Sequence, residues 1–150
     1  MRFCYLLAVI ICMTLSGCQT GTPGSDASSA PVEISGPAAS AIAGDMAARF
    51  AEQAGAAKTP LKLQADASEY SIALESALKG WGYTIVREGA GPDTGNAKAA
   101  RPTAVSYGLS AADGQVLARI STDTFAMGRA YSVTNGTAAP SSPLSLMTFN

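Results

Sequence analysis

Two dipeptides in the C-terminal half of this 150-residue chain constrain its fold more than any other feature. Asp113-Gly114 and Asn135-Gly136 each follow a run in which larger apolar side chains alternate with smaller ones. An Asp-Gly or Asn-Gly pair after such a run favours a tight β-hairpin, because both residues accept the positive φ angles of the turn. The pattern therefore predicts an antiparallel meander, with strands near residues 105–109, 116–120, 124–133 and 144–149.

The N-terminal half carries two helical patterns, and each is followed by a short strand pattern. Ile42, Met46 and Phe50 recur every four residues and predict a helix from an N-cap at Ser40 to about Gly55. A second apolar face predicts another helix, which begins near Asp66 or Ser68 and stops at Gly80 in a left-handed cap, with Glu75 and Lys79 paired on its outer side. Short strands are expected at 61–64 and 83–86, and a polar loop at 89–102. This order predicts one α+β domain, with two helices packed on one face of a small, mainly antiparallel β-sheet.

The chain opens with Met1-Arg2 and an apolar run over residues 3–13, which is typical of a signal peptide. As a helix this run is about 17 Å long, well short of the roughly 30 Å hydrocarbon core of a bilayer. The next residues, Leu15-Ser16-Gly17-Cys18, resemble the bacterial lipobox. That resemblance implies cleavage between Gly17 and Cys18 and lipid on the Cys18 thiol. An ordinary signal peptide ending in Cys and a retained anchor are the alternatives.

These signals divide the chain into three expected parts: a lipoprotein signal peptide at 1–17, a lipidated flexible tether at 18–39, and a small α+β periplasmic domain at 40–150. The tether is rich in Gly, Pro, Ser, Thr and Ala, and buries too little apolar surface to offset the entropy of ordering it. Val32 and Ile34 are its larger apolar residues, and a short extended contact with a partner is the alternative for them. Gln19 stands where Asp would resemble an inner-membrane retention signal, which favours sorting to the outer membrane.

Composition excludes several kinds of chemistry. The chain has no His, which rules out a Ser-His-Asp triad and imidazole metal ligands, and its formal net charge of -1 disfavours direct nucleic-acid binding. No phosphate loop, paired Cys, acidic metal triplet or nucleophile elbow has its required spacing. Asp113 and Asp123 are a conceivable carboxylate pair for sugar hydrolysis, but turn formation is the commoner reason for such residues. We therefore expect no enzyme, cofactor, metal or small-molecule substrate.

Three residues indicate a partner interface: Ile72, Arg129 and Tyr131. Arg129 interrupts a strand face that otherwise carries Phe, Met, Tyr and Val, and arginine beside aromatic side chains is typical of interface anchors. The alternatives for Arg129 are a side chain that snorkels from a half-exposed sheet or one that pairs with an acid. Ile72 falls on the polar side of its helix. Trp81 is expected to cover the core.

A family resemblance extends over nearly the whole chain. Its segments are the lipobox and tether, Ala43–Phe50, Ala77–Tyr83, Gly114–Arg119 and Phe125–Tyr131. Together they resemble the TrbH family, small conjugal-transfer lipoproteins encoded with plasmid mating-pair-formation genes. These segments are structural rather than catalytic, so Cys18 is the one functional position that the resemblance carries over.

The resemblance implies a structural component of a type IV secretion apparatus, held in the outer membrane by lipid (palmitate) on Cys18 and bound to other conjugative transfer channel proteins. The domain is expected to face the periplasm. Two alternatives remain open. A surface-exclusion or envelope-maintenance lipoprotein would lack secretion ATPase and pilin genes as neighbours, and a cell-wall hydrolase would need a carboxylate in a cleft.

Overall fold

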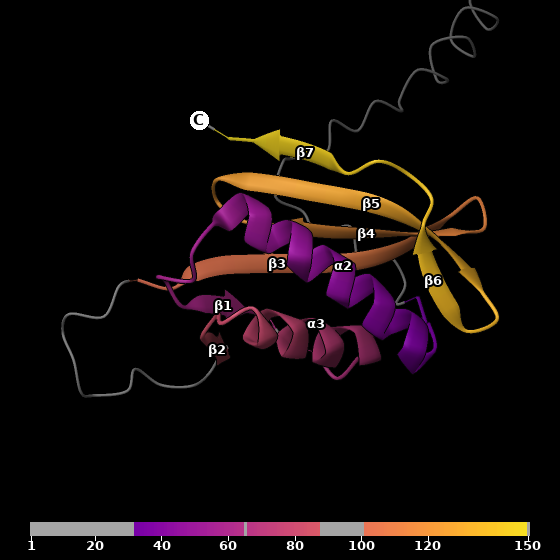
Figure 1. Ribbon diagram of the computed structural model, residues 1–150, viewed down its shortest axis with the longest axis horizontal. Helices are drawn as coiled ribbons and strands as arrows, with labels where there is room; N and C mark the ends of the chain where they lie inside the picture. The colour runs from indigo at the N-terminus through magenta and orange to yellow at the C-terminus, as the bar shows by residue number, and fades with distance from the viewer. Residues whose placement is uncertain (1–31, 65, 88–100, 150) are drawn as a thin grey trace, which may run out of the picture.

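The computed structural model describes residues 32–64, 66–87 and 101–149. This part of the chain has two helices and seven strands in one mixed sheet, and the predicted α+β class is confirmed. The helices are α2 (Gly36–Ala54) and α3 (Glu69–Gly80). The strands are β1 (Leu61–Leu63), β2 (Ile85–Arg87), β3 (Thr103–Ala112), β4 (Gln115–Ser121), β5 (Phe125–Thr134), β6 (Thr137–Pro140) and β7 (Ser145–Thr148). Both helices lie on the same side of the sheet (Figure 1).

The sheet combines a parallel and an antiparallel part. Its strand order is β2-β1-β3-β4-β5-β6, and β7 pairs with β5 beside β6. β1 runs parallel to both β2 and β3, whereas β3–β4, β4–β5, β5–β6 and β5–β7 are antiparallel. The parallel pairings of β1 lie outside the sequence prediction. The pair of β1 and β2 is parallel because α3 is the crossover between them and returns the chain in the same direction.

Both predicted hairpin turns are confirmed. Asp113 and Gly114 have φ angles of 50° and 73°, and Asn135 and Gly136 have φ angles of 51° and 78°. Two successive positive φ angles are typical of a type I′ turn, whose twist matches that of the flanking strands. The second turn leads into β6, a strand that the sequence pattern did not predict.

Helix α2 begins five residues earlier than predicted, so Ser40 is wrong as its N-cap. The N-cap is Ser35, and Pro37 lies in the first turn, where its missing N–H costs no helical hydrogen bond. Ser35 leaves the helix uncapped and instead donates from its hydroxyl to the carbonyl oxygen of Gly136 at 2.7 Å. Val32 and Ile34 pack against the core of this same domain.

Helix α3 begins at Glu69, and the hydroxyl of Ser68 caps it by accepting the N–H of Ser71 at 3.1 Å. At its other end the left-handed residue is Gly82, with φ 90°, so the predicted left-handed cap at Gly80 is wrong. Gly80 is the last helical residue. The pair between Glu75 and Lys79 is present at 2.6 Å, but Glu75 is buried rather than on the outer side.

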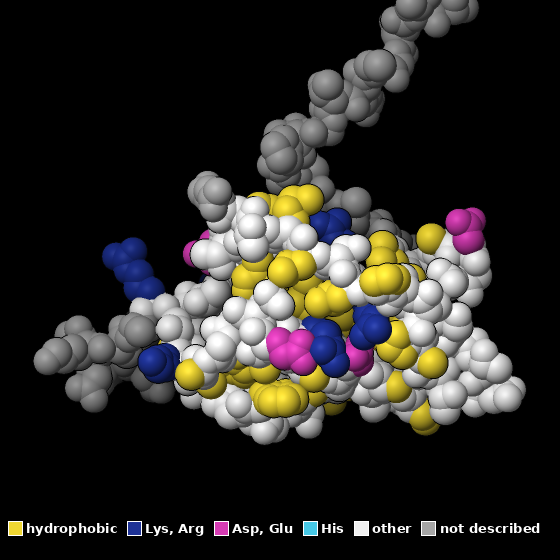
Figure 2. Space-filling model, turned by 45° about the horizontal axis from the view of Figure 1, so that its top comes forward, with side chains coloured by type: hydrophobic (Ala, Val, Ile, Leu, Met, Phe, Trp, Pro, Cys, Tyr) yellow, Lys and Arg dark blue, Asp and Glu magenta, His cyan; other side chains and the backbone are white. Residues whose placement is uncertain are grey.

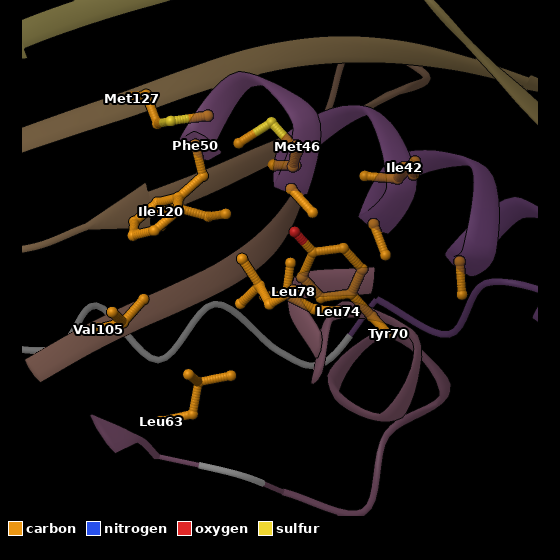
Figure 3. Close-up of a cluster of buried hydrophobic side chains, with 14 of the residues drawn as sticks. Ile42, Met46, Phe50, Leu63, Tyr70, Leu74, Leu78, Val105, Ile120 and Met127 are labelled. Atoms are coloured by element: carbon orange, nitrogen blue, oxygen red, sulfur yellow. The ribbon is translucent and has the colours of Figure 1, made fainter. Parts of the chain in front are cut away.

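The core lies between the helices and one face of the sheet, as Figure 3 shows. Ile42, Met46 and Phe50 project from α2, as the four-residue spacing predicts, and all three are buried. They meet buried residues of α3 and the strands, among them Leu63, Tyr70, Leu74, Leu78, Val105, Ile120 and Met127. Side chains on the other sheet face, such as Ser106 and Arg119, are exposed. The domain is therefore a two-layer structure with its core on one side of the sheet.

Candidate functional site

A mostly buried cluster of polar side chains joins α2 to β5. Arg129 donates from Nη1 to both carboxylate oxygens of Asp45, at 3.2 Å to Oδ1 and 2.9 Å to Oδ2. The hydroxyl of Tyr131 donates to Oδ2 of Asp45 at 2.6 Å. Arg129 and Tyr131 are two residues apart on β5, so their side chains share the sheet face that meets α2. One helical carboxylate thus accepts hydrogen bonds from two side chains of the same strand.

The same arginine holds the connection between β6 and β7. Its Nε donates to the carbonyl oxygen of Ser142 at 2.9 Å. The Ser142 hydroxyl accepts the N–H of Ala130 at 2.9 Å, and the N–H of Ser141 donates to the Ala130 carbonyl at 2.8 Å. Arg129 and Ala130 lie between the part of β5 that pairs with β7 and the part that pairs with β6. They therefore join α2, the sheet and the segment between β6 and β7.

The charges around Asp45 extend along α2 toward solvent. Arg49 lies 3.7 Å from Asp45 through Nε and binds Glu52 through Nη1 at 2.7 Å. Figure 2 shows acidic and basic side chains side by side on this face of the molecule, with hydrophobic side chains around them. Burial, followed by the hydrogen bond to the Asp45 carboxylate and its charge, raises the pKa of Tyr131 far above its usual range.

These contacts change the predicted role of two residues. Tyr131 is fully buried and its hydroxyl is bound within the chain, so it is wrong as a partner contact. For Arg129, the structure shows the alternative in which the arginine pairs with an acid. The sequence carried a signal for this pair at both ends. Arg129 interrupts an apolar strand face, and Asp45 borders the apolar stripe of α2. Arg49 lies four residues after Asp45, which is the spacing of a helical ion pair, and was therefore the nearer candidate partner for Asp45.

The other predicted interface residue is exposed. Ile72 on α3 exposes 60% of its surface, as its place on the polar side of the helix predicts. Trp81 follows the same helix and exposes 54%, so the prediction that it covers the core is wrong. The chain reverses at Trp81 and Gly82, and it is Tyr83 that turns inward and donates its hydroxyl to the Gly55 carbonyl at 2.8 Å.

Strand β7 forms a second exposed apolar surface. Leu146, Met147 and Phe149 expose 44%, 62% and 43% of their surfaces. All four residues of the strand are exposed, although it pairs with β5 along its whole length. The sequence pattern predicted this strand but not its exposure.

A shallow hollow of about 440 Å³ lies where β1, β3 and β4 meet. Its lining includes Lys62, Gln64, Ser106, Thr122 and Asp123. Asp113 lies at the other end of β4, and that seven-residue strand is about 20 Å long at 3.3 Å per residue. Two carboxylates for sugar hydrolysis must lie within about 10 Å of each other, so this pair is wrong as a hydrolytic site.

In residues 32–64, 66–87 and 101–149, no group of three or more metal-binding side chains is found. Neither helix in this part of the chain is long and apolar enough to cross a membrane. The predicted signal peptide, Gly17, Cys18 and most of the predicted tether lie outside the described residues.

Comparison with known proteins supplies the family evidence. The family model described as "Conjugal transfer protein TrbH" matches residues 20–150. A protein of Sinorhizobium fredii (strain NBRC 101917 / NGR234), named "Probable conjugal transfer protein TrbH", is 49% identical over 146 residues, which cover 97% of each chain. No solved structure matches the chain significantly.

Proposed function

We propose, because this chain belongs to the TrbH family of conjugal transfer proteins, that its role in conjugation is that of a lipid-anchored structural component of a type IV secretion apparatus. The observation that carries this proposal is the 49% sequence identity to a probable conjugal transfer protein over 97% of both chains. The protein acts by binding other proteins of the transfer channel, not by catalysis. Neither nucleic acid nor a small-molecule substrate is among its partners.

The anchor in this proposal is lipid on Cys18. Leu15, Ser16 and Gly17 have the residue types of a lipobox, and they follow an apolar run of the length of a signal-peptide core. The family match begins at residue 20, two residues after Cys18. A single acyl chain holds a protein only marginally, whereas several chains on one terminus make release slow. Gln19 favours the outer membrane, from which the domain extends into the periplasm.

Surface features of the domain support a binding role. Ile72, Trp81, Leu146 and Met147 are large apolar side chains that expose between 44% and 62% of their surfaces. Exposed apolar side chains that lie together often mark contacts with other proteins. The charged groups of Asp45 and Arg129 are bound to each other. That pair therefore stabilises the domain and leaves recognition to the exposed apolar side chains.

The test of the anchor compares two cysteine substitutions. Cys18→Ser should abolish palmitate labelling and move the protein out of the outer-membrane fraction. Cys12→Ser is the matched control, because Cys12 lies within the apolar run and should leave labelling intact. An unlabelled parent chain, or labelling that survives Cys18→Ser, would contradict the anchor.

The test of the role measures plasmid transfer. Deleting the gene should lower the transfer frequency at least tenfold, and the parent gene supplied in trans should restore it. Cys18→Ser should restore it poorly if anchoring is needed. Transfer at the parental frequency in the deletion strain would contradict a structural role in the channel.

A further inference from the structure

Strand β7 is a short edge strand, Ser145–Thr148, that carries neither a charged side chain nor proline. Soluble proteins block exposed edges with charged side chains, proline or a covering element. No charged side chain occurs between residues 130 and 150. Leu146 and Met147 are exposed on opposite faces of the strand, and Phe149 is exposed directly after it. Within the described residues β7 has a single strand neighbour, β5.

The hydrogen-bond pattern shows which backbone groups point to the open edge. The N–H of Phe149 donates to the carbonyl of Thr124 at 2.8 Å. Paired residues in an antiparallel ladder bond at every second position, so Met147 and Ser145 also bond toward β5. The N–H and C=O groups of Leu146 and Thr148 therefore point away from β5. They are two donors and two acceptors on an edge that can accept another strand.

We propose that β7 pairs antiparallel with β7 of a second copy of this chain, about a two-fold axis at Met147. In this register Leu146 of each copy lies opposite Thr148 of the other, and both pairs exchange two backbone hydrogen bonds. Met147 lies opposite its own counterpart on the helix-free face, and Ser145 lies opposite Phe149. The two sheets become one continuous sheet.

The absence of charge favours a second copy as the occupant. A two-fold interface is isologous, so a residue on the axis meets itself, and a charge there would face an equal charge. The central residue here is an exposed methionine, and the residues around it are uncharged over the whole of β6 and β7. The strand thus offers its own copy matched backbone groups, apolar side chains and no repulsion.

The length of the edge sets the strength of the contact. Strand β7 has four residues, and a strand pair centred on Met147 extends over about residues 145–149. Such a strand pair buries less than the roughly 1,000 Å² of a stable interface, so the free proteins associate weakly. Confinement to one membrane surface raises the effective concentration of both copies. Only this increase in effective concentration rests on the proposed lipid anchor; the strand pairing itself does not.

The register makes a geometric prediction for cysteines. Residues that lie opposite each other in a non-hydrogen-bonded antiparallel pair have Cα atoms about 4.5 Å apart, which a disulfide can bridge. Met147→Cys therefore places two thiols across the axis. Ser145→Cys is the matched control, because it is exposed on the same face of the same strand. Its own counterpart lies four residues along the strand, about 14 Å away and beyond disulfide reach.

The experiment uses the full chain in cell envelopes, treated with a mild oxidant and separated without reducing agent. We expect a disulfide-linked dimer for Met147→Cys at least tenfold more abundant than for Ser145→Cys. Equal cross-linking of both variants, no cross-linking of a stably folded Met147→Cys, or linkage to a different protein would each overturn the proposal. The parent chain tests the anchor separately. A parent dimer through an unacylated Cys18 would contradict lipidation, and a dimer specific to Met147→Cys would still support the strand pairing.

Discussion

Asp45 accepts hydrogen bonds from Arg129 and Tyr131, and these contacts determine how α2 is fixed to β5. The three side chains are far apart in sequence and partly withdrawn from water. A buried donor that loses its acceptor costs more than the net value of one hydrogen bond, because its desolvation is no longer offset. The cluster is therefore sensitive to the loss of any one member.

The first prediction is that the effects of Asp45→Ala and Arg129→Ala on stability are strongly coupled. Asp45→Ala should lower the free energy of unfolding by about 2–3 kcal/mol, because it leaves Arg129 and Tyr131 without their acceptor. The double variant Asp45→Ala/Arg129→Ala should be at least about 1 kcal/mol more stable than additivity predicts. Urea unfolding measures all three variants. The control is Glu52→Ala, which breaks an exposed ion pair and should change the free energy of unfolding by less than about 1 kcal/mol. If the effects of Asp45→Ala and Arg129→Ala simply add in the double variant, the two residues act independently and the prediction is wrong.

The second prediction concerns two buried tyrosines. Burial raises the pKa of Tyr70 and Tyr131 above the value of 10.0 that is usual for an exposed tyrosine. Above about pH 10 the unfolded chain releases these protons while the folded chain keeps them, so the free energy of unfolding falls as pH rises. Tyr131→Phe and Tyr70→Phe should each make this fall less steep.

The same two variants should differ near pH 7. Tyr131→Phe removes the hydrogen bond to Asp45 and should cost about 1 kcal/mol. Among the described residues the Tyr70 hydroxyl is buried without a partner, so Tyr70→Phe should cost nothing or stabilise the fold. Equal losses at pH 7 would contradict the different surroundings of the two hydroxyls.

At the scale of elements, the meander depends on local turn chemistry. Gly114 has a φ angle of 73°, and an added Cβ there would meet no atom within 4 Å. The backbone angle alone therefore decides how a substitution of Gly114 changes the stability of the domain. Gly108 lies within β3, and an added Cβ there would also meet no atom within 4 Å, but its φ angle is not positive.

The third prediction compares these two glycines. Gly114→Ala should destabilise the domain by about 1 kcal/mol or more, because alanine is strained at positive φ. Gly108→Ala should be neutral or slightly stabilising, since it only reduces the freedom of the unfolded chain. Thermal unfolding of both variants makes the comparison, and a larger loss for Gly108→Ala would contradict it.

At the scale of the whole molecule, the start of α2 decides where the independent domain begins. Ala38 and Ala39 are fully buried, Val32 and Ile34 pack on the core, and Ser35 bonds to the turn at Gly136. These contacts join the first described residues to the far end of the meander. The ordered domain therefore reaches back at least to Val32.

The fourth prediction compares two fragments. A fragment of residues 32–150 should unfold in one cooperative transition. A fragment of residues 40–150 loses the first turn of α2 and its buried contacts, and should be less stable by about 3 kcal/mol or more. Urea unfolding followed by circular dichroism measures the difference. Equal midpoints would show that residues 32–39 add nothing to the fold.

The sequence by itself determined those features that depend on neighbouring residues. The helical stripe of Ile42, Met46 and Phe50, the two Asx-Gly turns and the strands β3, β4 and β5 follow from periodicity and turn chemistry. The α+β class follows from their order, and the family comparison over residues 20–150 confirms the family that the sequence resembles. The lipid on Cys18 and the partners in the transfer channel stay predictions.

Only the tertiary structure decided the features that join distant parts of the chain. Short strands such as β1 and β2 carry no signal for direction, so their parallel pairing depends on the path of α3. The partner of Arg129 was undecided in the sequence, because Asp45 is 84 residues away and a nearer basic residue had the local spacing. The sequence likewise did not predict that Trp81 and β7 are exposed. An apolar side chain is buried only if another element covers it, and no local pattern specifies that element.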